Sequence, residues 1–306
     1  METLLEPFEL AFFRNGVIVA TLAGALCGLV GTYVVVRGMS YIGHGLSHAV
    51  FGGAAAAAAV GLNLFLGAAV WGVAAALAIA RVARRRVLGS DAAIGVVTTA
   101  SFALGLVLIG TVPRARRSTE ALLFGSVLGV EPADVLAVAG VAAAVVAVVF
   151  VRYRELLFAT FDPEVADASG VDVARTDALL MVVLGVSVVV TMEVLGAVLV
   201  AATLVIPAAV ARMLSHSFGR VLLAASAIGA LCGFVGMNLS YHLDVSSGAA
   251  IVLVGAALFV VVFAATTPRQ RVAATRRQRS ATIRAEAAEN DRSARDSPLG
   301  AQTTRM

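Results

Sequence analysis

The chain has 306 residues, of which 60% are hydrophobic and 14% are charged, and its formal net charge at pH 7 is +4. All 23 of its basic residues are arginine. Because a Walker A loop needs a lysine, this composition excludes an ordinary nucleotide-binding site on the chain itself. Lysine Schiff-base catalysis is excluded for the same reason, and we expect no enzyme activity from this chain.

Apolar stretches of about 20 residues, the length that crosses a bilayer, recur along residues 1–266. They predict an all-α polytopic membrane protein rather than a barrel, whose strands would alternate over about ten residues. We expect nine spans, at residues 15–36, 41–62, 64–81, 91–112, 133–151, 177–192, 194–212, 219–240 and 247–266. The turn between the sixth and seventh spans is placed at Glu193, the only charge within residues 178–211. Without that turn the count is eight.

A five-residue motif in the first span occurs again in the eighth. Gly24-Ala-Leu-Cys-Gly28 is identical to Gly229-Ala-Leu-Cys-Gly233. Small residues spaced four apart let membrane helices approach each other closely. The repetition indicates either an inverted repeat or, more simply, a shared need for close packing.

His44 and His48 lie at the beginning of the second span. Residues four apart on a helix share a face, with Cβ atoms about 5–6 Å apart, so two imidazoles at this spacing can hold one zinc, copper, iron or nickel ion. An ionisable residue inside a membrane helix is by default a functional-site hypothesis. No glutamate lies between them, so the general base of a zinc protease is missing and the pair would hold and release an ion. The alternative is two polar residues satisfied near a helix start.

The longest charged segment between spans covers residues 152–175. Asp162 is suited to cap a helix and Pro163 to begin it, and Gly170 is suited to end it. The pattern predicts a short helix over residues 163–168 that docks a partner, with an ordinary solvated loop as the alternative. Further along, Glu193 is either a carboxylate on an outer-side metal path or a turn residue at the surface.

Arginines in the connecting loops predict the orientation, because cytoplasmic loops carry an excess of basic residues. They follow the third, fifth and seventh spans, which places the N-terminus outside the cell membrane and the C-terminus in the cytoplasm. The arginines at positions 114–117 are the exception. Residues 267–306 hold nine arginines against four acidic residues, and they predict a disordered, arginine-rich cytoplasmic tail.

Several stretches together resemble the permease subunits of the zinc, manganese and iron ABC importers, the ABC-3 family. They are VRGMSYIGHGLSHAV (36–50), AAIGV (92–96), SFALGLVL (101–108), LLFGS (122–126), FDPEVA (161–166), GAVLVAATLVIPAAVAR (196–212) and SGAAIVL (247–253). The resemblance implies an ABC importer permease fold, a homodimer, a separate ABC ATPase and an extracytoplasmic metal-binding lipoprotein. It also implies that the docking segment is the coupling helix, with contributions from Phe161, Asp162, Pro163, Glu164, Ala166 and Gly170.

One departure from the family concerns the metal. The family usually has aspartate where this chain has His44, so a carboxylate–imidazole pair becomes an imidazole pair. Softer ligands favour zinc over manganese, and we expect zinc to be the preferred cargo, ahead of manganese or iron, with no permanently bound cofactor and no nucleic-acid partner. The alternatives are a permease for metal–chelate complexes, an ion-coupled secondary transporter, which would need more intramembrane carboxylates, and a membrane scaffold.

Overall fold

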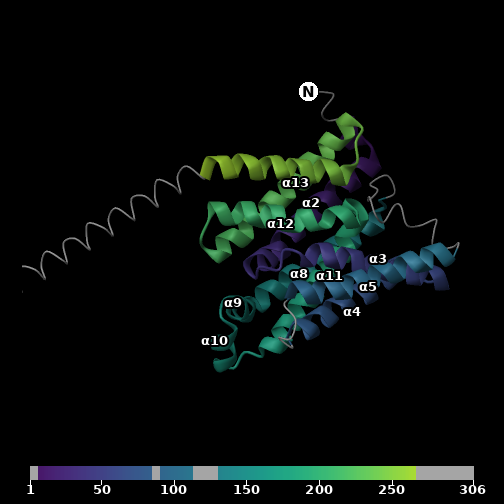
Figure 1. The fold of residues 1–306 in the computed structure, drawn as a ribbon. Helices are drawn as coiled ribbons and strands as arrows, with labels where there is room; N and C mark the ends of the chain where they lie inside the picture. Colours follow the sequence, from purple (N-terminus) through teal and green to yellow (C-terminus); the bar gives the residue numbers. More distant parts are fainter. Residues whose placement is uncertain (1–5, 85–89, 113–129, 267–306) are drawn as a thin grey trace, which may run out of the picture. The chain divides into compact units, whose positions relative to one another are not determined.

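The computed structural model describes residues 6–84, 90–112 and 130–266, and these form helices joined by short turns. In chain order the helices are η1 (Glu6–Glu9), α2 (Ala11–Val36), α3 (Ile42–Val60), α4 (Leu64–Arg84), α5 (Ser90–Thr111), α8 (Pro132–Val151), α9 (Tyr153–Phe161), α10 (Pro163–Ala168), α11 (Val173–Leu195), α12 (Ala197–Leu214), α13 (Phe218–Leu243) and a last helix, Ser247–Thr266 (Figure 1).

The predicted polytopic helical class is confirmed. Over the described ranges, nine helices have at least 18 residues, and they match the nine expected spans. Seven of them are long and apolar enough to cross a membrane by length and composition alone. The other two are α3, which carries two histidines, and α12, whose apolar part is the shorter stretch Leu199–Leu214.

The predicted turn at Glu193 is wrong by three residues. Helix α11 continues through Glu193 to Leu195, and the break falls at Gly196. Gly196 has φ 77° and ψ 147°, a backbone conformation that is essentially restricted to glycine. A single glutamate, in contrast, costs a helix little in backbone terms, so the glycine and not the charge decides where the chain turns.

The repeated motif packs against its own second copy. Helices α2 and α13 run antiparallel, and a Cβ built on Gly24 would lie 2.1 Å from the carbonyl oxygen of Gly229. A Cβ built on Gly229 would lie 2.0 Å from the carbonyl oxygen of Gly24. Gly28 and Gly233 meet the backbones of Ala225 and Ala20 in the same way. Both copies of the motif therefore serve close packing of the same two helices, and the inverted repeat stays a prediction.

This contact predicts a large effect of one methyl group. We expect Gly229→Ala to destabilise the purified protein by about 1–3 kcal/mol, because the added Cβ must push two helix backbones apart. Thermal unfolding in detergent measures the effect. Gly140→Ala on α8 is the matched control, since a Cβ there meets nothing within 4 Å. A Gly229→Ala protein that unfolds at the same temperature as Gly140→Ala would contradict this contact.

The chain divides into two compact units, Met1–Phe259 and Val260–Met306. Every residue of the candidate site described below belongs to the first unit. The predicted tail at residues 267–306 and the arginine exception at residues 114–117 lie outside the described residues.

Candidate metal site and docking segment

The histidines follow a tight reversal between α2 and α3. Gly38 adopts φ 69°, and its N–H donates to the carbonyl of Val35, while the N–H of Met39 donates to the carbonyl of Val34. This is the usual glycine-dependent end of a helix. The chain enters α3 at Ile42, so both histidines lie within the first two turns of that helix.

The structure places the two imidazole rings in direct contact. Nε2 of His44 and Nε2 of His48 are 3.1 Å apart, and the ring centroids are 4.4 Å apart at an interplanar angle of 89°. Two nitrogens that share a tetrahedral zinc ion at 2.0–2.1 Å lie about 3.3–3.4 Å from each other. At 3.1 Å one ring nitrogen donates a hydrogen bond to the other, and this separation is only slightly shorter than that of two ligands on one ion.

The pair lies on α3 next to residues that face the neighbouring helices α5 and α12. Gly43 and Gly45 flank His44, and a Cβ on Gly43 would lie 2.8 Å from Leu204 of α12. A Cβ on Gly45 would lie 2.6 Å from Ile94 of α5. The two glycines thus let both neighbouring helices approach the backbone beside His44, which leaves the histidines half-buried.

Aromatic rings border the pair on both sides. Phe102 of α5 packs edge-on against His48, with ring centroids 4.8 Å apart, and Tyr41 packs beside His44 at 5.5 Å. Nδ1 of His48 is buried and has no hydrogen-bond partner among the described residues. A permanent metal ligand almost always donates its second ring nitrogen to a partner, so this histidine lacks the usual support of a fixed site.

The described residues supply only two metal ligands at this place. They contain no group of three or more His, Cys, Asp or Glu side chains that could hold a metal ion together. A closed structural zinc site needs four ligands. One copy of the chain therefore offers an open site, at which an ion keeps water molecules or takes ligands from another molecule and can leave again.

The predicted helix over residues 163–168 is confirmed as α10. Asp162 caps it by accepting a hydrogen bond from the N–H of Val165 at 3.0 Å, and Pro163 is its first residue. It ends where Gly170 adopts φ 83°, with the N–H of Val171 donating to the carbonyl of Ala166 at 3.0 Å. Helix α9, which was not expected as a separate element, leads into it, and the two lie beside each other (Figure 1).

Helix α10 has an inner and an outer face. Ala166 is fully buried, while Val165 is 50% exposed and Phe161, just before the helix, is 61% exposed. Glu164 is also exposed. Of the residues predicted for coupling, Ala166 therefore seats the helix on the protein, while Phe161, Asp162 and Glu164 present a surface with apolar and acidic groups.

Two residues that the sequence did not single out connect this segment to α2. Arg37, the C-terminal cap of α2, forms hydrogen bonds with Thr160 of α9 and Asp177 of α11. Phe218, at the start of α13, packs against Tyr33 of α2 and against Phe161. The segment that precedes the histidines is thereby tied to the segment that carries α10.

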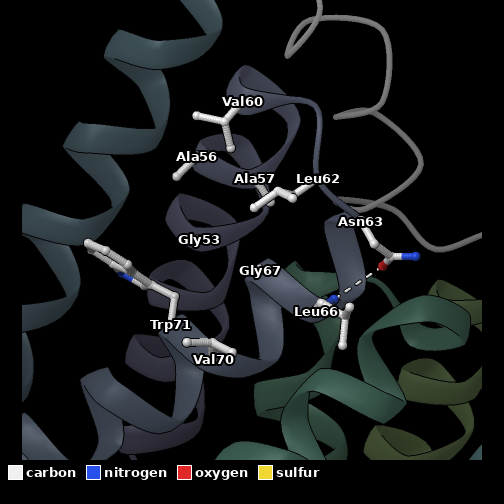
Figure 2. Close-up of a pocket in the computed structure, with 10 residues that line it drawn as sticks. All are labelled: Gly53, Ala56, Ala57, Val60, Leu62, Asn63, Leu66, Gly67, Val70 and Trp71. Carbon is white, nitrogen blue, oxygen red and sulfur yellow. Dashed lines mark hydrogen bonds between the residues drawn. The ribbon is translucent and has the colours of Figure 1, made fainter.

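Glu193 lies in the last turn of α11, and its role on a metal path stays a prediction. A hollow on the described surface lies elsewhere. It holds about 400 Å³ between the end of α3 and the start of α4. Figure 2 shows it bordered by Val60, Leu62, Leu66, Val70 and Trp71, while the side-chain oxygen of Asn63 accepts a hydrogen bond from the backbone of Leu66. This apolar lining offers no metal ligand.

Comparisons with known proteins cover the histidine pair and the α10 segment together. A model of the ABC 3 transport family matches residues 9–266. The manganese transport system membrane protein MntC of Listeria innocua is 37% identical over 257 residues, or 83% of this chain and 91% of that protein. The chelated iron transport system membrane protein YfeC of Yersinia pestis is 33% identical over 276 residues, or 90% of this chain and 93% of that protein. The structure of PsaBC from Streptococcus pneumoniae in complex with Fab matches with a TM-score of 0.76 at 34% identity, over 85% of this chain and 94% of that chain.

Proposed function

Because the chain belongs to the ABC 3 transport family, we propose that this integral membrane protein is the permease subunit of an ATP-driven importer of a divalent transition metal. The observation that supports this most is the 3.1 Å separation of the two Nε2 atoms at the start of α3. A cargo site must bind an ion and release it, and an open site of two neutral imidazoles does both.

Zinc is the proposed cargo, with manganese and iron as the alternatives. Two imidazoles form a softer donor set than an imidazole and a carboxylate, and softer nitrogen ligands favour zinc over manganese. The two named relatives are described as manganese and chelated-iron transport proteins, so the choice of metal depends on the replacement of the family's usual aspartate by His44. Because YfeC is described as a chelated iron transport protein, a metal–chelate complex is the second candidate for the cargo.

The proposed partners follow from what the chain lacks and what it exposes. It has no lysine for a nucleotide-binding loop, and Val165 and Glu164 of α10 are exposed together with Phe161, the last residue of α9. We place a separate ATPase on this surface, at the cytoplasmic side, and an extracytoplasmic metal-binding lipoprotein at the opposite side. A second copy of the permease completes a homodimer in the cell membrane.

Reconstitution tests this function. The chain is inserted into liposomes with its ABC ATPase and the metal-binding lipoprotein, and the uptake of radioactive zinc, manganese and iron is followed with and without ATP. We expect ATP-dependent uptake with zinc as the fastest ion. Uptake that needs no ATP and stops when a protonophore or sodium ionophore collapses the ion gradient would support a secondary transporter and contradict the proposal.

A further inference from the structure

One arginine holds both ends of the segment that contains α10. Nη1 of Arg37 lies 2.6 Å from Oδ1 of Asp177, near the start of α11. Nε of Arg37 donates to Oγ1 of Thr160, in the last turn of α9, at 3.1 Å. Thr160 precedes α10 and Asp177 follows it, so a single guanidinium group connects the end of α9 to the start of α11, on either side of α10.

The same arginine also begins the turn that leads to the histidines. Arg37 is the C-terminal cap of α2, and the reversal at Gly38 connects it to α3. His44 follows seven residues later. The connection is also fixed by backbone hydrogen bonds: the N–H of Met39 donates to the carbonyl of Val34, and the N–H of Ile42 donates to the carbonyl of Met39. Because the connection is short and hydrogen-bonded, a displacement of Arg37 is expected to displace the start of α3 as well.

The surroundings make this contact stronger than an ordinary surface ion pair. The side chains of Arg37 and Asp177 are only 11% and 24% exposed. Phe218 packs against both Tyr33, one helical turn before Arg37, and Phe161, next to Thr160. In such partly buried surroundings a charge-assisted pair is screened less by solvent, and the fixed fork of an arginine holds two acceptors in one geometry, which a lysine does not.

The chain provides its own comparison. Arg175 and Asp172 form an ion pair at 3.0 Å in the same part of the structure, but their side chains are 86% and 48% exposed. Both residues lie at the beginning of α11. Exposed pairs of this kind contribute little, so the two pairs differ in burial and in what they connect.

We propose that Arg37 is a positioning residue of the transport cycle, which transmits movement of α10 to the turn that carries His44 and His48. The inference rests on the proposed function, because it assumes that an ATPase moves α10 and that the histidines hold the cargo. Arg37 contacts neither the metal nor the ATPase in this account. Its role is to make α10 and the turn that carries His44 and His48 move together.

The test measures the number of metal ions transported per ATP hydrolysed, in liposomes that contain the permease and its ATPase and are supplied with the metal-binding lipoprotein. The variants are Arg37→Ala, Asp177→Asn and Thr160→Val, and Arg175→Ala is the matched control. Zinc binding to the purified permease and its assembly with the ATPase are measured alongside. We expect Arg37→Ala and Asp177→Asn to bind zinc and to assemble within about twofold of the wild type, to hydrolyse ATP, and to transport at least about tenfold fewer ions per ATP.

Arg37→Lys gives a second readout, since it keeps the charge but loses the fork. We expect it to restore the transport ratio only in part, while Arg175→Ala keeps the wild-type ratio. Should Arg37→Ala fail to fold, the isosteric Asp177→Asn and Thr160→Val variants decide the question. A wild-type transport ratio in folded Asp177→Asn would overturn the inference. A wild-type complex that transports no metal would instead overturn the proposed function.

Discussion

Replacing His44 and His48 together with alanine is expected to lower the initial rate of zinc uptake by about 100-fold or more. Loss of the groups that merely support metal ligands already costs roughly 10–100-fold in affinity, and this variant loses the ligands themselves. The described residues offer no third or fourth ligand that can take their place. Radioactive zinc uptake at matched expression measures the effect.

The histidine prediction has two controls. His242→Ala removes an exposed histidine at the end of α13, and we expect uptake at the wild-type level. His44→Asp restores the carboxylate and imidazole that the family usually has, and we expect it to keep uptake while shifting the preference from zinc toward manganese, because a carboxylate is the harder ligand. Zinc uptake by the double alanine variant at the level of His242→Ala would return the pair to a structural role.

Reversing the charges of Asp162 and Glu164 is expected to uncouple the ATPase. With both residues replaced by arginine, we expect metal-dependent ATP hydrolysis and uptake to fall by about tenfold or more, because an ATPase surface that accepts two carboxylates would meet two positive charges instead, and mismatched charges at an interface cost several kcal/mol. The long helices should fold as before, since both side chains are exposed. ATPase activity and co-purification of the two subunits are the measurements.

A milder pair of changes separates docking from local folding. Asp162 also caps α10, and Asp162→Asn keeps a capping side chain, so Asp162→Asn with Glu164→Gln removes the charge while α10 keeps its start. We expect an intermediate loss of coupling. Glu9→Arg, a charge reversal at an exposed residue of η1, should change nothing. Coupling that survives the double arginine variant would place the ATPase on another surface.

Local features of the fold were predictable because they depend on neighbouring residues. The limits of α10 follow from Asp162, Pro163 and Gly170, and the structure has the helix at Pro163–Ala168 as predicted. The approximate positions of the nine long helices follow from hydrophobic runs of about 20 residues. The turn at Gly196 was missed because apolar composition continues on both sides of it, and only its backbone conformation distinguishes it from the helical glycines nearby.

The long-range contacts of the candidate site were not predictable in the same way. The spacing of His44 and His48 predicts that they share a helix face, and their rings do meet. The partners of Arg37, in contrast, lie 123 and 140 residues away in the chain, and helical periodicity carries no information about such pairs. Arg37 nevertheless lies within the stretch at residues 36–50 that resembles the family, which was the one available signal.

X-ray absorption spectroscopy at the zinc K-edge, on zinc-loaded permease in complex with its ATPase, shows directly whether His44 and His48 hold the metal ion. In the wild type we expect two imidazole nitrogens per zinc at about 2.0–2.1 Å, with oxygen ligands filling the remaining positions. In the variant with both His44 and His48 replaced by alanine, the imidazole signal should disappear and bound zinc should be lost. A wild-type protein without imidazole ligands, or a double variant with the same spectrum as the wild type, would contradict the account.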